Sequence, residues 1–527
     1  MTEHKSRTIF KGAFILTVAG LISKILSAGY RVPLQNITGD LGFYIYQQVY
    51  PILGIAVILS LYGFPAAISK LVSEISEEHK TLSFPSFFIP VFLWMAGICG
   101  LIFIIGYSQA STIAAVMGDM KLVPSLRSAF FVFLLVPFVS LLRGVFQGGN
   151  QMGPTASSQI IEQLIRVSII IATAVWVMRS ERLYAIGIGA STAALAGALG
   201  AILVLVLYAR KHQVWSYQRW ESSISYIKTI LFYGLFICFN YMMLLSLQLV
   251  DAFTLVRGLI DFGIDLESAR VSKGIFDRGQ PLIQLGTVLA SSIALALIPS
   301  VTKPRLKKNP ELVKGYMFTA TKFSLVVAAG ATVGLIVLFP EINRLFFQSE
   351  DGTQVLRLLS IVILFTSLAI TTSSILQGLG YVTHTAFYVL AAILFKTLCN
   401  LWLIPYLGLE GAAAASLIAV VFVWLANVIT LRKHFPIKKW LELPWSSIVI
   451  ASIGMIILLM FLRILGGLVV ELDHRAVLLF YTLSLTGIGA TLYFVLLFIT
   501  GAFTKAELKQ IPFHDKWGEF LPKGRIR

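Results

Sequence analysis

Residues Phe10–Leu34 read FKGAFILTVAGLISKILSAGYRVPL, a run long and apolar enough to cross a bilayer as one helix. Apart from Lys11 at its start, two cations interrupt the run. Because Lys24 and Arg31 are two helical turns apart, they point to nearly the same side of that helix. A cation in hydrocarbon costs about 3 kcal/mol even on the lower, insertion-based scales. Two cations on one face therefore indicate a protein interior or a water-filled cavity that receives an anion.

The rest of the chain has the composition of a membrane protein. Of its 527 residues, 57% are hydrophobic and only 13% are charged, against about 25% charged residues in soluble domains. No segment shows the alternation of a membrane β-barrel, so we expect an all-α polytopic membrane protein. The net charge is +17, but the basic residues do not form a basic domain with interleaved aromatic residues, which argues against a nucleic-acid partner. Cys99, Cys238 and Cys399 have neither disulfide nor metal-site spacing and are expected to be packing residues.

Hydropathy predicts fourteen membrane-spanning helices, the first of them an uncleaved helix rather than a signal peptide. The predicted spans are Phe10–Val32, Phe43–Lys70, Phe87–Tyr107, Leu122–Phe146, Thr155–Val177, Tyr184–Tyr208, Ile227–Leu249, Pro281–Val301, Met317–Phe339, Leu356–Gln377, Ala386–Tyr406, Gly411–Leu431, Ile448–Val470 and Arg475–Ile499.

The lysines and arginines set the predicted orientation. With the N-terminus inside, the N-terminal segment, the even-to-odd loops and the C-terminal segment hold half of the 42 basic residues, far more than the opposite loops. The densest clusters, Lys303–Lys314, Arg432–Lys439 and the tail from Lys505, all fall on that inner side. We therefore expect an N-in, C-in, multi-pass protein of the plasma membrane, whose basic loops contact anionic membrane lipids.

The chain also repeats itself. Gln147–Gly148 and Thr155–Ala156 recur with the same spacing as Gln377–Gly378 and Thr385–Ala386. The repeat unit is six helices, and since six is even, both copies enter the membrane in the same direction. Two parallel six-helix lobes with a cavity at their interface are a common transporter plan. The predicted organisation is therefore residues 1–218 (helices 1–6), 219–440 (helices 7–12), and 441–527 (helices 13–14 and a basic tail).

Six, six and two helices resemble the multidrug/oligosaccharidyl-lipid/polysaccharide (MOP) exporter superfamily. Within it, the chain is similar to the branch that holds stage V sporulation protein B and the MurJ-type lipid II flippases of Gram-positive bacteria. The stretches that carry the resemblance are Ser23–Pro33, Tyr62–Glu74, Arg143–Gly148 and Asp277–Leu282.

The resemblance implies a flippase that moves an undecaprenyl-pyrophosphate-linked saccharide to the outer leaflet by alternating access, with cations of the central cavity binding the pyrophosphate. By motif, those cations carry over to Lys24, Arg31 and Arg278. A lysine stands where many MurJ proteins have arginine, and a lysine binds phosphate without the bidentate fork. The cargo is left open among lipid II, a teichoic or capsular precursor and a spore-cortex intermediate.

Three further cations are predicted to bind the substrate. Arg166 aligns with Lys396 in the repeat, and Arg143 ends the fourth span, where anchoring on the positive inner side is the alternative. Arg166 follows Glu162 by one helical turn, so an intrahelical ion pair that neutralises both residues is an equal alternative. Lys396 has Ala392 at the matching position and is therefore expected to lack such a partner.

Energy coupling has few candidates in the sequence. Without a Walker lysine motif, the chain is expected to use no cofactor and to couple to the membrane potential, Na⁺ or H⁺. Glu162, Asp251 and Asn400 are the candidate coupling or gating residues. Asp251 is placed at the start of the longest outer loop, which runs to Gln280 and is expected to form a short surface helix or a gate.

Three other functions compete with the flippase. A multidrug exporter of the same superfamily needs a buried acid for a cationic substrate, and Glu162 is the only acid placed squarely within a predicted span. An enzyme is not expected, because the histidines are scattered and none pairs with a carboxylate at a useful spacing. A scaffold that works with cell-wall synthesis proteins is the remaining alternative.

Overall fold

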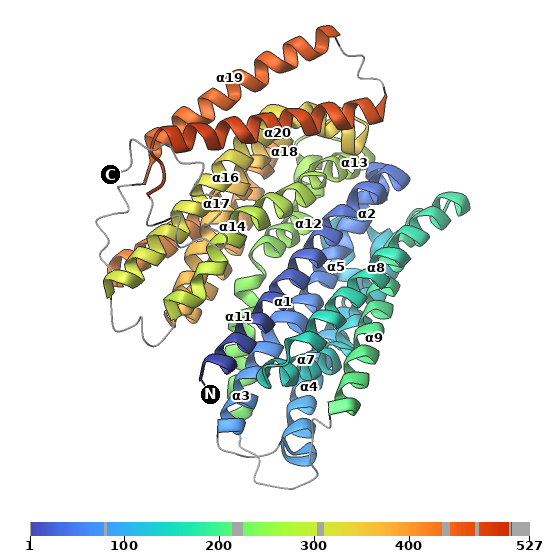
Figure 1. The fold of residues 1–527 in the computed structure, drawn as a ribbon. Helices are drawn as coiled ribbons and strands as arrows, with labels where there is room; N and C mark the ends of the chain where they lie inside the picture. The colour runs from blue at the N-terminus through green and yellow to red at the C-terminus, as the bar shows by residue number, and fades with distance from the viewer. Residues whose placement is uncertain are drawn as a thin grey trace. The chain divides into compact units, whose positions relative to one another are not determined.

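The computed structural model describes residues 2–77, 82–212, 225–302, 310–434, 443–469 and 474–504, together with residue 507. Every regular element in these ranges is a helix (Figure 1), and eleven helical stretches are long and apolar enough to cross a membrane. Each of the fourteen predicted spans coincides with helical residues in the described ranges. The prediction of an all-α polytopic membrane protein is therefore confirmed, whereas the parallel lobes and the N-in orientation stay predictions.

Contacts divide the chain into two compact units. Unit 1 comprises Met1–Asp277 and Val389–Ala412, and unit 2 comprises Arg278–Tyr388 and Ala413–Arg527. The helices of unit 1 are α1 (Thr2–Gly29), α2 (Arg31–Ile58), α3 (Phe64–Glu77), α4 (Ile89–Ser108), α5 (Ala110–Met117), α6 (Val123–Phe130), α7 (Val136–Gly148), α8 (Met152–Ser180), α9 (Ala185–His212), α10 (Ser225–Lys228), α11 (Leu235–Tyr241), α12 (Met243–Asp261) and α13 (Leu266–Asp277). Those of unit 2 are α14 (Gly279–Thr302), α16 (Pro310–Phe347), α17 (Thr353–Gly378), α19 (Trp445–Val469) and α20 (Arg475–Ile499), and α18 (Val382–His434) contributes to both units.

Two glycines divide helical stretches that are too long for one crossing. A bilayer core takes about 20 helical residues, whereas the candidate spans Val18–Ser76 and Val382–His434 have 59 and 53 residues. Gly39 (φ 67°) and Gly408 (φ 56°) break the helical geometry inside them. Both angles lie in the left-handed region, which glycine adopts without a Cβ penalty. Each break falls in the gap that hydropathy predicts between two adjacent spans.

The segment predicted as the longest outer loop is mostly helical. A short helix expected there is present as α13, whereas the placement of Asp251 in the loop is corrected. Helix α12 continues to Asp261, and α13 follows after a short turn. Asp265 begins α13 by accepting hydrogen bonds from the backbone N–H groups of Ser268 and Glu267, at 3.0 and 3.1 Å. These hydrogen bonds favour the ionised form and hold the pKa of the Asp265 carboxyl below its usual range. Asp251 therefore lies inside a helix and not in a loop.

Helix α13 packs closely on α2 through a glycine. A Cβ atom on Gly274 would lie 2.1 Å from the backbone oxygen of Asp40, and a backbone atom cannot rotate aside. Gly274→Ala is therefore expected to destabilise the protein by about 2 kcal/mol, as overpacking usually does. The measurement is the midpoint of thermal unfolding in detergent.

The matched control for that change is Gly97→Ala in α4, where nothing lies within 4 Å of the added Cβ. Alanine is the better helix former by about 1 kcal/mol, so the control is expected to melt at the same or a higher temperature. Equal melting of the two variants would contradict the close contact between α13 and α2.

Candidate functional site

Lys24 and Arg31 share one helical face, as the sequence predicts. Although α1 ends at Gly29, helical hydrogen bonds continue across the junction: Tyr30 N donates to Leu26 O at 3.2 Å, and Leu34 N donates to Tyr30 O at 3.0 Å. Helix α1 packs against α8, and both helices belong to unit 1. The ammonium-bearing side chain of Lys24 is half-buried and has neither an ion pair nor a hydrogen bond within the described residues.

Arg31 is a fully buried cation without a carboxylate partner. Its side chain is 0% exposed, and Nε, Nη1 and Nη2 make no hydrogen bond to the part of the chain that the structure describes. The guanidinium lies over the ring of Tyr50, 4.2 Å from the ring centroid. Its nearest electrostatic neighbours also include the Tyr30 and Tyr46 phenols, which hydrogen-bond to each other. A ring face attracts a cation, but it leaves all five N–H donors available to an anion.

Arg143, Glu162 and Arg166 form one buried cluster. Glu162 accepts from Arg143 Nη2 at 2.8 Å and from Arg166 Nη2 at 2.5 Å. The Glu162–Arg166 ion pair is the intrahelical alternative that the sequence predicts. The pairing of Glu162 with Arg143 joins two different helices, so spacing along one helix cannot predict it. Arg143 also donates Nε to Ser158 Oγ and Nη1 to Ser60 O. Each of the three guanidinium nitrogens of Arg143 thus has a partner within the protein, and its role in substrate binding stays a prediction.

Arg166 differs from Arg143 in what remains free. Its Nε is buried and makes no hydrogen bond within the described residues. Like Arg31, Arg166 interacts electrostatically with the hydroxyl of Tyr30. One carboxylate shared by two arginines leaves the cluster with a net positive charge. Unit 1 therefore contains Lys24, Arg31 and Arg166 as cations that are unpaired or only partly paired.

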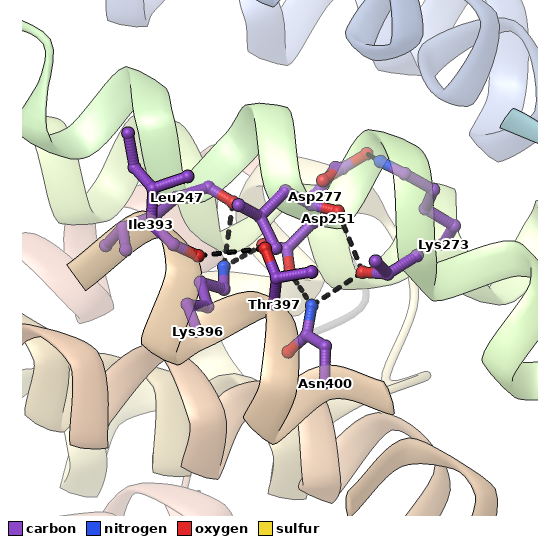
Figure 2. Close-up of polar contacts among 10 residues, drawn as sticks. Leu247, Asp251, Lys273, Asp277, Ile393, Lys396, Thr397 and Asn400 are labelled. Atoms are coloured by element: carbon purple, nitrogen blue, oxygen red, sulfur yellow. Dashed lines mark hydrogen bonds and ion pairs between the residues drawn. The ribbon is translucent and has the colours of Figure 1, made fainter. Parts of the chain in front are cut away.

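Lys396 has an acidic partner, contrary to the sequence prediction. Its Nζ donates to Asp251 Oδ2 at 2.6 Å and to Leu247 O at 2.8 Å. Asn400 Nδ2 donates to the other Asp251 oxygen at 3.0 Å and to Thr254 Oγ1 at 2.7 Å (Figure 2). The prediction was wrong because it looked for an acid on the same helix, whereas this acid comes from α12. The substrate-binding candidate Lys396 and the coupling candidates Asp251 and Asn400 thus form a single network.

A second buried pair adjoins this network and was missed from the sequence. Lys273 Nζ donates to Asp277 Oδ2 at 2.6 Å on α13. Figure 2 shows the two pairs near each other, and Lys396 interacts electrostatically with both members of the second pair. The spacing of one helical turn between Lys273 and Asp277 was available as a signal.

Arg278 belongs to unit 2 and is buried there. Its Nη1 donates to Asn343 Oδ1 at 3.4 Å, and its guanidinium lies 5.5 Å from the centroid of the Phe347 ring. Its role as a phosphate clamp stays a prediction.

The buried charges of the described residues are asymmetric. Each buried carboxylate there has a cationic partner, in the pairs Asp119–Arg270, Glu162–Arg143, Asp251–Lys396, Asp277–Lys273, Glu341–Arg463 and Glu507–Lys322. Arg31 has no such partner in these ranges. The same ranges hold no group of three or more histidines, cysteines and acids that could bind a metal ion. The described residues therefore include a buried cation without an acidic partner, but no buried acid without a cationic one.

Eleven stretches of the described residues that are long and apolar enough to cross a membrane define a multi-pass membrane protein, and comparison with known proteins identifies it as a transporter. The chain belongs to the polysaccharide biosynthesis protein family, whose model matches residues 9–304. It is 39% identical to the membrane protein YabM of Bacillus subtilis (strain 168), over 98% of this chain and 97% of YabM. It is 26% identical to lipid II flippase MurJ of the same organism, over 81% of this chain and 83% of MurJ. It is also 26% identical to stage V sporulation protein B of that organism, over 96% of this chain and 98% of that protein.

Solved structures agree with this assignment at the level of the fold. The inward closed conformation of lipid II flippase MurJ matches with a TM-score of 0.65 at 17% identity, over 93% of this chain and 98% of that chain. An inward-facing MATE-family multidrug transporter of the MOP superfamily matches with a TM-score of 0.62 at 16% identity, over 79% of this chain and 94% of that chain. The resemblance to the MOP superfamily is confirmed, and the protein is a membrane transporter rather than an enzyme.

Proposed function

We propose that this protein is a flippase for a polyprenyl-pyrophosphate-linked saccharide, of which lipid II is the representative to test. The observation that carries the proposal is the buried, unpaired guanidinium of Arg31 in an interior whose described carboxylates are all paired. A pyrophosphate in hydrocarbon without compensation is prohibitively unfavourable. Charge-assisted hydrogen bonds from Arg31 and its neighbours replace the lost hydration of the pyrophosphate.

Each cation has a proposed part in this site. Arg31 binds a phosphate in a bidentate manner, and Lys24 adds a mobile point charge two turns away on the same face. Arg166 offers its free Nε while Glu162 holds the rest of its guanidinium. Arg278 is proposed as the clamp of the opposite half. Alternating access by rocking of the two predicted lobes, residues 1–218 and 219–440, then exposes the site to each leaflet in turn.

Coupling is proposed to rest on the membrane potential, with Na⁺ or H⁺ as alternatives. A bound pyrophosphate carries net negative charge, and each elementary charge that crosses the membrane is worth about 2.3 kcal/mol per 100 mV. Glu162 and Asp251 are both held in ion pairs. We propose that these residues fix helix positions during the cycle, together with Asn400.

Two other functions make different demands on the site. Export of cationic drugs needs an unpaired buried acid, and the described residues hold none. A scaffold for cell-wall synthesis proteins, in vegetative or sporulating cells, needs no unpaired interior cation. The fold is common to lipid II flippase MurJ and to a multidrug transporter, so the fold does not distinguish the two functions. The buried charges do distinguish them, and they favour an anionic cargo.

The function is tested with the full chain in liposomes that carry fluorescent lipid II, scored by the accessibility of the label in each leaflet. Protein-dependent transfer that responds to an imposed potential is the expected result. A cationic dye in the same vesicles is expected not to be transported. Transport of the dye without transfer of lipid II would replace this proposal with the drug exporter. Transport of neither would favour the scaffold or a different polyprenyl-linked saccharide.

A further inference from the structure

A cavity of about 770 Å³ opens at one end of unit 1, away from Arg31. It lies between the beginning of α6, the end of α8 and the beginning of α9. Three candidate spans have their ends here: one starts at Met120, one ends at Ser180 and one starts at Ala185. The cavity is therefore at the level where a membrane span meets the layer of lipid headgroups.

The deeper wall of the cavity is formed by α8 and α9, which approach each other closely. A Cβ atom on Gly189 would lie 2.1 Å from the Thr173 side chain, so only glycine permits this approach. Ile188 and Trp176 line the same wall, and Trp176 is 53% exposed. Tryptophan is enriched where a membrane span meets water. An occupant of this wall has to be apolar along at least part of its length.

The outer rim of the cavity is cationic. Lys121 and Arg182 line it, both are exposed, and neither makes an ion pair within the described ranges. The Lys121 ammonium lies 5.4 Å from the centroid of the Tyr184 ring. Glu181 is the one acid in the lining, so the rim keeps a net positive charge. An anion at the rim is favoured over a neutral or zwitterionic group.

A buried carboxylate fixes this rim in place. Asp119 Oδ2 accepts from the Tyr184 hydroxyl at 2.7 Å, and Asp119 Oδ1 accepts from the backbone N–H of Lys121 at 3.1 Å. Arg270 of α13 completes the arrangement with an ion pair to Asp119 at 3.0 Å. Lys121 and Tyr184 are therefore held by the same side chain. A preformed rim spares an incoming ligand part of the entropic cost of ordering it.

We infer that this cavity binds one molecule of an anionic phospholipid, with its phosphate between Lys121 and Arg182 and an acyl chain along Trp176, Ile188 and Gly189. A cationic rim above an apolar wall matches the two halves of such a lipid. This site is separate from the cations proposed to bind the cargo, and the inference does not depend on what the protein transports. Under the predicted N-in topology, the lipid belongs to the outer leaflet.

Native mass spectrometry of the full chain tests the inference, with phosphatidylglycerol and phosphatidylcholine of identical acyl chains as probes. A basic residue at a membrane surface strengthens binding of anionic lipid by about fivefold. The wild-type protein is expected to retain phosphatidylglycerol preferentially, and Lys121→Gln/Arg182→Gln is expected to lose about twentyfold of that preference. Arg179→Gln is the matched control, because Arg179 lies in the last turn of α8 but does not line the cavity.

Glu181→Gln is expected to increase lipid binding, a result that misfolding of the variant cannot produce. Removing the acid from the rim is expected to raise retention of phosphatidylglycerol by about fivefold. Glycerol 1-phosphate is the soluble competitor, and it is expected not to displace the lipid because it cannot use the apolar wall. Displacement by glycerol 1-phosphate would assign the rim to free phosphate compounds. Equal retention of the two lipids by the wild type, or unchanged preference in the double variant, would overturn the site.

Discussion

Replacing Arg31 with methionine is expected to abolish transport while leaving the protein as stable as before, or more so. A charged hydrogen bond is worth about 1.5–3 kcal/mol, so loss of two such bonds to a phosphate predicts at least a hundredfold lower rate of lipid II transfer. The stability effect has the opposite sign, because Arg31 has no ion pair or hydrogen bond within the described residues. An apolar side chain of similar length removes a desolvated charge from the interior.

Two further variants separate charge from geometry. Arg31→Lys keeps the charge without the fork and is expected to give an intermediate rate. Arg127→Met is the matched control, since the Arg127 guanidinium also lies over a tyrosine ring, 5.5 Å from the Tyr107 centroid, but is exposed. It is expected to leave transport unchanged. A loss of stability in Arg31→Met as large as its loss of transport would show that Arg31 is a structural residue.

Breaking the Lys396–Asp251 pair is expected to be the most destabilising single change. Both side chains are buried, at 2.6 Å from each other, so either partner alone becomes an uncompensated interior charge. The expected cost of Lys396→Met is about 3–5 kcal/mol in the free energy of unfolding. In Asp251→Asn/Lys396→Met, where neither charge remains, most of that loss is expected to be recovered. The measurement is an unfolding titration of each variant in detergent micelles.

An exposed ion pair in the same unit provides the control. Lys70 and Glu74 lie one helical turn apart on α3 with their charged atoms at 4.0 Å, and both side chains are about half exposed. Lys70→Met is expected to cost less than about 0.5 kcal/mol. If Lys396→Met is equally mild, Lys396 is not paired as described. If the double variant is stable but cannot transport lipid II, the pair contributes to transport beyond its effect on stability.

A contact between two charged residues can be predicted from the sequence when both residues lie on the same helix. Hydropathy located the helical spans, and the gaps between them coincide with the left-handed glycines Gly39 and Gly408. The face shared by Lys24 and Arg31 and the pairing of Glu162 with Arg166 also follow from helical period, because residues one or two turns apart must be neighbours.

Contacts between helices were decided by the tertiary structure. Arg143 completes the Glu162 cluster from α7, and Asp251 reaches Lys396 from α12. Asp119 accepts hydrogen bonds from the hydroxyls of Tyr44 and Tyr184 and pairs with Arg270, three residues from separate segments. None of these pairings has a spacing that hydropathy or periodicity can detect, since they join residues that are distant in the chain. The sequence by itself determined that cations lie inside a helical membrane protein. Only packing decided which of them are neutralised and which, like Arg31, remain available, because a charge in a low-dielectric interior is governed by its nearest partner in space.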